Sequence, residues 1–342
     1  MRLNARRAAE PAAGAAAFVL VAMAFFAFIG EPPVRTMLAM TEYAVGDAYS
    51  LSETLVKTTP ILLCALAAIV PGRLGLISVG AEGQLYFGAL VGTGLVLAIA
   101  PGGAWPLLGA VLLAGAAGGA AWGWLPGFFR ARIGVNETIT TLLLNYVAIL
   151  LVSAAVYGPW KDPANLGWPA TIAFPDWAVA PSLFGTRVHA GLIVGVAAAI
   201  VLQVLFRYSR WGQALDVLKG NPRVGRMVGL NHGRQVMFAM ALGGAMAGLA
   251  GITEAGAIQG RLQPGISVGY GLTGFLVAWL SGHNALLAVP ISFLVGGLIA
   301  AGDTLQLFNK VPAASATVLQ GLLFATALAV PGLFRVWRAR HG

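Results

Sequence analysis

The chain has 342 residues, of which 58% are hydrophobic and 10% are charged, with a net charge of +9. A water-soluble globular protein carries about 25% charged residues, so this composition excludes a soluble enzyme or binding module. It predicts an all-α polytopic membrane protein, and the 46 glycines predict close packing between its helices. Four scattered histidines and a single cysteine, Cys64, exclude a disulfide framework and indicate no metal site.

Ten apolar stretches have roughly the length needed to cross about 30 Å of hydrocarbon. They cover residues 12–29, 58–70, 83–100, 105–129, 138–157, 188–206, 236–254, 270–280, 285–301 and 314–334. The second and the eighth are short. The second can extend back through residues 51–57, and the eighth has Gly-rich flanks that allow an unwound continuation. Short, glycine-interrupted spans point to a substrate path.

The basic residues indicate the orientation of the chain in the membrane. With the N-terminus in the cytoplasm and spans that alternate, 15 of the 21 lysines and arginines lie inside. This excess is what the positive-inside rule requires, so we expect both termini to be cytoplasmic. The charge is thus explained by topology, and we expect no nucleic-acid partner. The alternative for residues 1–29 is a cleaved signal peptide; nine further spans favour a retained anchor.

Two loops stand out. Residues 158–187 are rich in Pro and Trp and are expected on the outer side of the membrane. They could form a lid, a docking surface or an ordinary connecting loop.

Residues 207–235 are expected on the inner side and carry six of the fifteen inside charges. Their pattern predicts two short helices, near residues 211–218 and 223–230, because a Pro at 222 ends one helix and can start the next. Such a hairpin suits a protein partner; the alternative is a solvated basic loop that only sets topology.

The sequence contains no P-loop, and two other matches to enzyme motifs lack the structural setting that those motifs require. None of the four lysines follows a glycine, so the chain has no P-loop, and ATP-driven action would need a separate ATPase. The residues from Gly269 to Gly274 spell G-x-G-x-x-G, and those from Gly265 to Gly269 spell G-x-S-x-G. Both motifs require a strand-turn-helix setting, whereas these precede a membrane span. We therefore expect no catalytic residues in this chain.

Acidic residues in or beside apolar spans are costly and are functional candidates by default. Glu82 is either a gate or substrate contact, or an acid stabilised by a helix dipole. Glu137 follows Asn136, a good helix cap, and its position favours a structural role. Glu254 and Asp303 are expected at outer helix ends, where solvation makes a charge cheap.

The letters Ile-Ser-Val-Gly occur at residues 77–80 and again at residues 266–269. The topology above places one copy inside and one outside, as an inverted repeat with broken helices would do. A chance match of four letters in so biased a composition is the alternative.

Four motifs occur in order: Gly80-Ala-Glu-Gly-Gln84, the run from Gly134 to Tyr146 (GVNETITTLLLNY), Gly220-Asn-Pro222 with Gly229 seven residues on, and Gly269-Tyr-Gly271. With them the chain resembles permease subunits of bacterial ABC importers, in the nucleoside branch of the ribose/simple-sugar-type permease family. The motifs extend from the third to the eighth span, so the resemblance covers most of the chain, as a single transmembrane permease domain.

The resemblance implies a multi-pass protein of the bacterial inner membrane that works in a complex. Its partners would be a cytoplasmic ABC ATPase that binds ATP and Mg, a second, shorter permease that completes a heterodimer, and an extracytoplasmic substrate-binding lipoprotein; the surrounding lipid is the remaining contact. The chain itself would need no cofactor.

The resemblance also assigns the 207–235 loop as the element that couples to the ATPase. The expected coupling residues are Trp211, Asp216, Lys219, Gly220, Asn221, Pro222, Arg223, Arg226 and Gly229. Two depart from the pattern expected there, since Asp216 replaces a usual Arg and Lys219 a usual small residue. Interface charge determines specificity, so we expect a matched ATPase to carry compensating charges.

A nucleoside path should combine aromatic stacking with amides or acids. The candidates are Glu82, Gln84, Tyr86, Asn145, Tyr146, Phe275 and Trp279; for the aromatic ones, packing or lipid-facing roles are the alternative. The leading alternative function is an ABC permease for a sugar such as ribose or galactose. An ion-coupled secondary transporter is less consistent with the basic Gly-Asn-Pro hairpin.

Overall fold

The computed structural model describes residues 2–99, 103–165, 167–183, 185–309, 311–312 and 314–341, and these are helical apart from loops and one isolated bridge between Ser182 and His189. The all-α prediction is confirmed for this part of the chain. The helices are α1 (Arg2–Phe28), α2 (Pro33–Val45), α3 (Ala48–Gly72), α4 (Ala81–Ile99), α5 (Leu107–Ile133), α6 (Glu137–Tyr157), η1 (Asp176–Ala178), α7 (Gly191–Tyr208), α8 (Arg210–Gly220), α9 (Pro222–Met227), α10 (His232–Thr253), the π-helical turn η2 (Glu254–Ile258), α11 (Tyr270–Leu280), α12 (Ala285–Asn309) and α13 (Ala314–His341).

Seven helices are long and apolar enough to cross a membrane, and α1 with α2, bent by 115°, makes an eighth candidate. Two shorter apolar helices, Tyr270–Leu280 and Ala314–Val330, complete the set. Each of the ten predicted stretches thus coincides with a helix, although Ala100, the end of the third, lies outside the described residues. The second stretch extends back to Ala48 as α3. The chain is a multi-pass membrane protein, while the count of ten crossings stays a prediction.

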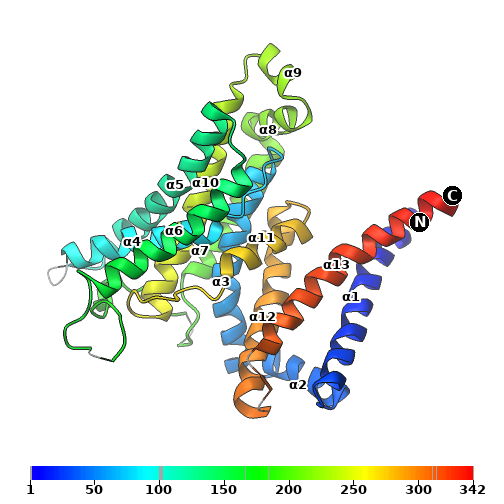
Figure 1. Ribbon diagram of the computed structural model, residues 1–342, viewed down its shortest axis with the longest axis horizontal. Helices are drawn as coiled ribbons and strands as arrows, with labels where there is room; N and C mark the ends of the chain where they lie inside the picture. Colours follow the sequence, from blue (N-terminus) through cyan, green and yellow to red (C-terminus); the bar gives the residue numbers. More distant parts are fainter. Residues whose placement is uncertain are drawn as a thin grey trace. The chain divides into compact units, whose positions relative to one another are not determined.

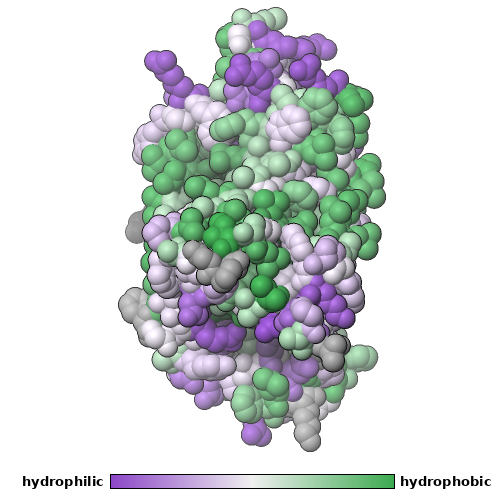
Figure 2. All heavy atoms as spheres, turned by 90° about the vertical axis from the view of Figure 1, so that its left-hand side faces the viewer, coloured by the Kyte–Doolittle hydropathy of each residue, from purple (hydrophilic) through white to green (hydrophobic). Residues whose placement is uncertain are grey.

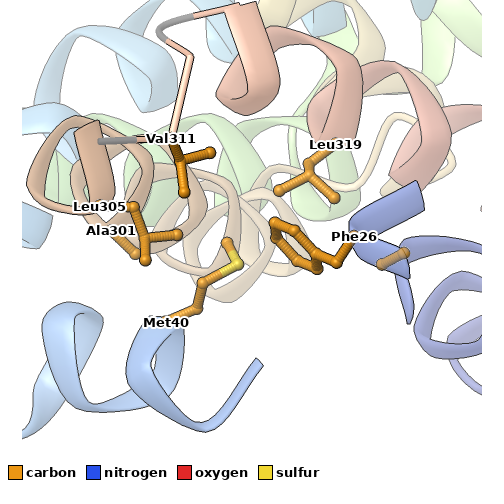
Figure 3. Close-up of a cluster of buried hydrophobic side chains, with 7 residues drawn as sticks. Phe26, Met40, Ala301, Leu305, Val311 and Leu319 are labelled. Carbon is orange, nitrogen blue, oxygen red and sulfur yellow. The ribbon is translucent and has the colours of Figure 1, made fainter. Parts of the chain in front are cut away.

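The chain divides into two compact units. The first comprises residues 1–57 and 293–342, where α1 and α13 lie side by side (Figure 1). Its core is a cluster of buried apolar side chains, in which Phe26 and Met40 meet Leu305 and Leu319 (Figure 3). Lys57 and Asp303 form an ion pair of 3.1 Å in this unit. The Asp303 side chain is 56% exposed, so it is solvated as predicted, but it does not lie at a helix end, because α12 continues to Asn309.

The second unit, residues 58–292, is organised around α4, α5 and α10. Glycines at four-residue spacing line the crossing of two of these helices, with Gly115, Gly119 and Gly123 on α5 facing Gly244 and Gly248 on α10. A methyl group added at Gly119 or Gly248 would collide with a backbone carbonyl oxygen of the other helix. Small residues let helix backbones approach closely in a membrane, so the close packing predicted from glycine content is present here.

The outer surface of this unit is apolar. Figure 2 shows a broad hydrophobic band across one face, with hydrophilic residues gathered at the upper end, where α8 and α9 lie in Figure 1. Leu113 on α5 and Leu150 on α6 are 71% and 66% exposed. Side chains of this kind on long apolar helices are suited to contact with lipid.

Candidate functional site

Two helices of the second unit are preceded by unwound backbone. Residues 76–79 are non-helical before α4, and residues 259–269 are non-helical before α11. Each Ile-Ser-Val-Gly segment ends at the residue directly before one of these helices. Gly269 has a φ of +90°, which favours glycine. The unwound flank expected before residue 270 is therefore confirmed.

The unwound segment before α4 is held by side chains of α6. Asn145 Oδ1 accepts the N–H of Gly83 at 2.8 Å, and Asn145 Nδ2 donates to the carbonyl of Val79 at 2.9 Å. The N–H of Val79 donates to Thr141 Oγ1 at 3.2 Å. These backbone groups have no helical partners, so the α6 side chains satisfy groups that would be costly to bury unpaired.

The same arrangement continues toward the start of α6. Thr138 Oγ1 donates to the carbonyl of Ile77 at 2.9 Å, and the N–H of Ile77 donates to Glu137 Oε1 at 3.3 Å. Glu137 Oε2 also pairs with Arg130 Nε at 3.3 Å. The predicted cap is confirmed, because Asn136 Oδ1 accepts the N–H groups of Thr138 and Ile139. Glu137, Thr138, Thr141 and Asn145 together form what we call the α6 ladder.

The ladder follows from the helical repeat. Residues four apart lie on the same face of an α-helix, about 6.0 Å apart along its axis. Polar side chains at positions 137, 141 and 145 therefore reach successive backbone groups between Ile77 and Gly83. Sequence reasoning missed Thr138 and Thr141, although the polar i, i+4, i+8 spacing at the start of an apolar helix was the available signal.

The N-termini of α4 and α11 meet at Glu82. Its carboxylate accepts the N–H of Gly271 at 2.6 Å, and a side chain on Gly271 would collide with the backbone of Glu82. Ser267 Oγ accepts the N–H groups of Gly269 and Tyr270 at 3.2 and 3.0 Å. An acid at a helix N-terminus is stabilised by the helix dipole, and here the buried Glu82 serves the N-terminus of α11 from the first turn of α4.

The structure brings some of the predicted path residues together. Gln84 and Tyr86 are buried in the first two turns of α4, beside Glu82, and Tyr86 Oη donates to the carbonyl of Ser267 at 3.5 Å. Asn145 joins them through Gly83.

The other three candidates lie elsewhere. Tyr146 is 62% exposed on α6. Phe275 and Trp279 pack against each other on the exposed side of α11, with ring centroids 6.0 Å apart.

One expectation for an acidic residue is wrong. Glu254, placed by the sequence at a solvated outer helix end, is only 3% exposed. The reason is local: α10 does not end there but passes into the π-helical turn η2, which carries Glu254 into the packed interior. Such turns within helices are frequent at functional sites, so Glu254 joins the candidate site.

The predicted hairpin is present as α8 and α9. Ser209 Oγ caps α8 by accepting the N–H of Gly212 at 3.1 Å, and Asn221 Oδ1 caps α9 by accepting the N–H of Arg223 at 2.9 Å. Pro222 occupies the first position of α9, where a missing N–H has no cost.

Two of the predicted coupling residues hold the hairpin to its own chain. Asp216 pairs with Arg73 at 2.7 Å, and the Arg73 guanidinium lies 5.3 Å from the ring centre of Phe206. Trp211 Nε1 donates to Gln235 Oε1 at 3.0 Å. The unusual acid at position 216 thus has its compensating charge within this chain.

The tip of the hairpin is exposed and apolar. Val224, Met227 and Val228 are 46%, 86% and 66% exposed. The remaining predicted coupling residues, which are Lys219, Gly220, Asn221, Pro222, Arg223, Arg226 and Gly229, are also exposed. The apolar three were missed from the sequence; their signal was apolar letters within an otherwise polar loop. Contiguous exposed apolar residues with a polar rim mark interaction sites.

Comparison with known proteins shows which sequences this chain is similar to. The family model described as "Branched-chain amino acid transport system / permease component" matches residues 50–328. The chain is 33% identical over 303 residues to a glucose ABC transporter permease of Haloferax volcanii, covering 85% of this chain and 79% of the relative. It is 30% identical over 280 residues to a guanosine ABC transporter permease of Bacillus subtilis, covering 78% and 77%. A nucleoside ABC transporter permease of Lactococcus lactis is 26% identical, covering 82% and 78%.

Proposed function

We propose a function for this chain from the premise that it belongs to the permease-component family of the branched-chain amino acid transport systems. The chain is a permease subunit of an ABC transporter, and ATP hydrolysis takes place in an ATPase partner. Nucleoside import is the activity that we assign to the complex. The relatives that transport guanosine and nucleosides support this assignment.

The α8–α9 hairpin is the observation that carries the mechanism. Its base is fixed to the body of the permease by Arg73–Asp216 and Trp211–Gln235, while its tip presents Met227 to a partner. A rigid base and an exposed apolar tip allow movement of the ATPase to be transmitted to the spans. Closure of the ATPase dimer on ATP would then switch the permease between inward- and outward-open states.

The junction of α4 and α11 is the proposed substrate path. Asn145 lies eight residues after the start of α6, which is about 12 Å along the helix, and it holds Gly83. The junction therefore falls near the middle of a hydrocarbon core of about 30 Å. Two helix N-termini that meet at this depth support an inverted repeat with broken helices. The topology that we propose around it has ten crossings and cytoplasmic termini, in accord with the positive-inside rule.

The substrate recognition that we propose rests on polar groups at this junction. The buried side chains of Glu82, Gln84, Tyr86 and Asn145 supply acceptors and donors for a nucleobase edge or a ribose hydroxyl. Glu254 adds a second acid, and Phe275 with Trp279 adds aromatic surface. A sugar is the second candidate substrate, because a glucose permease is among the relatives.

The complex that we propose contains two further subunits. A shorter permease would complete a pseudo-symmetric heterodimer in a bacterial inner membrane. An extracytoplasmic lipoprotein would deliver substrate to the 158–187 loop, in which Trp177 and Phe174 are buried and Trp168 is 60% exposed.

Uptake of labelled adenosine, guanosine, uridine, ribose and glucose by cells with and without the gene tests the assignment. We expect gene-dependent nucleoside uptake that disappears when the partner ATPase is inactivated. Loss of sugar uptake alone would transfer the assignment to the sugar candidate. Uptake that survives ATPase inactivation would overturn the ABC mechanism in favour of an ion-coupled carrier.

The coupling role has its own test. We expect Met227→Glu to abolish co-purification of the ATPase and uptake, because a charge replaces an apolar docking side chain. Gln213→Glu, which adds the same charge at an exposed position of α8, is the matched control and should retain both. If both variants lose ATPase binding and uptake equally, the loss is an effect of the added negative charge, and docking at the tip is contradicted.

For the substrate path, Glu82→Gln should cut uptake while complex assembly is retained, because the amide oxygen can still accept the N–H of Gly271. Glu42→Gln, at an exposed position of α2, is the control. Unaltered uptake in Glu82→Gln would remove Glu82 from the path.

A further inference from the structure

A basic pocket lies outside the proposed path, where the end of α5, the end of α9 and the start of α10 meet. Its volume is about 500 Å³, within the range of about 300–1,000 Å³ that is typical of ligand sites. The residues that line it are Arg130, Ala131, Arg226, Gly229, Leu230, Asn231, His232, Gly233 and Val236. None of these is acidic, and three carry basic side chains.

The donors in this pocket come from separate elements. Arg130 is at the end of α5, and Arg226 is in α9. Glu137 Oε2 accepts from Arg130 Nε at 3.3 Å. The two terminal nitrogens of that guanidinium can therefore donate to another acceptor. The Nδ1 atom of His232 is buried without a partner among the described residues. The cavity thus offers two guanidinium groups and a ring nitrogen that can donate to an anion when it carries the proton.

Backbone donors at the start of α10 add to this set. Asn231 Oδ1 accepts the N–H of Arg234 at 3.0 Å, so the cap satisfies the third residue of the helix. The first N–H groups of a helix have no intrahelical partner, and those of His232 and Gly233 belong to residues that line the pocket. Arginine forks bind phosphate oxygens bidentately, and a helix N-terminus favours the same charge.

We propose that this pocket binds a phosphate group, presented by the headgroup of an anionic phospholipid. The pocket lies at the ends of two membrane spans, α5 and α10, which is the level of the headgroups. Basic pockets between transmembrane helices hold anionic headgroups elsewhere. A free phosphate ion offers the same chemistry, so the two sources are separated by experiment. The proposal concerns binding only and stands whether or not the transported substrate is a nucleoside.

The test uses the purified full chain in detergent. Native mass spectrometry measures retention of phosphatidylglycerol and of phosphatidylcholine, and calorimetry measures binding of inorganic phosphate. We expect phosphatidylglycerol to bind and phosphatidylcholine to bind at least ten-fold more weakly. Arg226→Ala should weaken phosphatidylglycerol binding about ten-fold, because it removes a charge-assisted hydrogen bond.

Arg223→Ala is the matched control, because Arg223 is also exposed on α9 but does not line the pocket. Arg226→Lys keeps the charge and should restore part of the binding. Inorganic phosphate that competes with phosphatidylglycerol would show that both anions occupy this pocket and would support the proposal. Equal retention of the two lipids, or equal loss in the Arg223 and Arg226 variants, would overturn it.

Discussion

Asn145 of α6 binds backbone groups on both sides of the start of α4. Its side chain accepts the N–H of Gly83 within α4 and donates to the carbonyl of Val79 before it. The side chain is 6% exposed, and it is 62 residues from Gly83 in the sequence. Together with the other residues of the α6 ladder, this one amide holds the start of α4 and the unwound segment before it against α6.

Replacement of Asn145 should destabilise the junction. Asn145→Leu leaves one donor and one acceptor buried without partners, at a cost of about 1–3 kcal/mol each. We expect a lower melting temperature and a loss of uptake. Ser153→Ala removes only a hydrogen bond within α6 itself and should change neither strongly. If Asn145→Leu melts and transports like the parent chain, the ladder does not hold the segment.

The glycine crossing of α5 and α10 gives a second prediction. Gly119→Ala forces the helices apart at a backbone carbonyl, and overpacking of this kind costs about 1–3 kcal/mol. Gly109→Ala, on the same helix with open space around the added methyl, should leave the stability unchanged or raise it. Thermal unfolding in detergent compares the two. Similar melting temperatures would show that the crossing tolerates a wider separation.

The Arg73–Asp216 pair should act as a small orienting contact. Because the Asp216 side chain is 55% exposed, we expect a coupling energy of only about 0.2–1 kcal/mol in a double-mutant cycle. Asp216→Ala should nevertheless reduce ATP-dependent uptake more than stability, because it frees the base of the hairpin. The charge-swapped double variant, Arg73→Asp with Asp216→Arg, should recover uptake. Failure of the swap together with normal uptake in Asp216→Ala would contradict an orienting role.

The environment of His283 predicts that the stability of the fold depends on pH. Burial, together with the positive charges of Lys219 and Arg73, lowers the pKa of His283 below its ordinary value of 6.5. The unfolded chain then binds the proton more tightly than the folded chain, so this contribution to stability is complete above about pH 6.5 and is lost as the pH falls. His283→Asn, which tolerates the φ of +60°, should show a smaller drop in melting temperature between pH 7.5 and pH 5.5. Parallel curves for the two proteins would refute the assignment.

Much of the architecture was readable from local sequence. Apolar runs of the right length predicted the spans, because hydrocarbon requires backbone groups to bond within a segment. The cap at Asn136 and the break before Pro222 were also correct, because capping and proline geometry act over a few residues. Such features need no knowledge of what lies across the fold.

The contacts that define the site were not readable in this way. Asn145 and Glu82 were singled out for their chemistry, yet their partners, Val79, Gly83 and Gly271, are reached only through the packing of α6 and α11 against α4. Glu254 was misplaced because a single π-helical turn moved it from a helix end into the interior.

Composition and the order of apolar and basic residues determined the class of protein, the apolar helices and the helical hairpin of residues 207–235, since each depends on hydrophobicity and local backbone geometry. The pairing of Asp216 with Arg73, the ladder along α6 and the meeting of two helix N-termini depended on which helix faces approach each other. That choice follows from the combined packing of the second unit, where glycines let α5 and α10 meet, and no short stretch of sequence contains it.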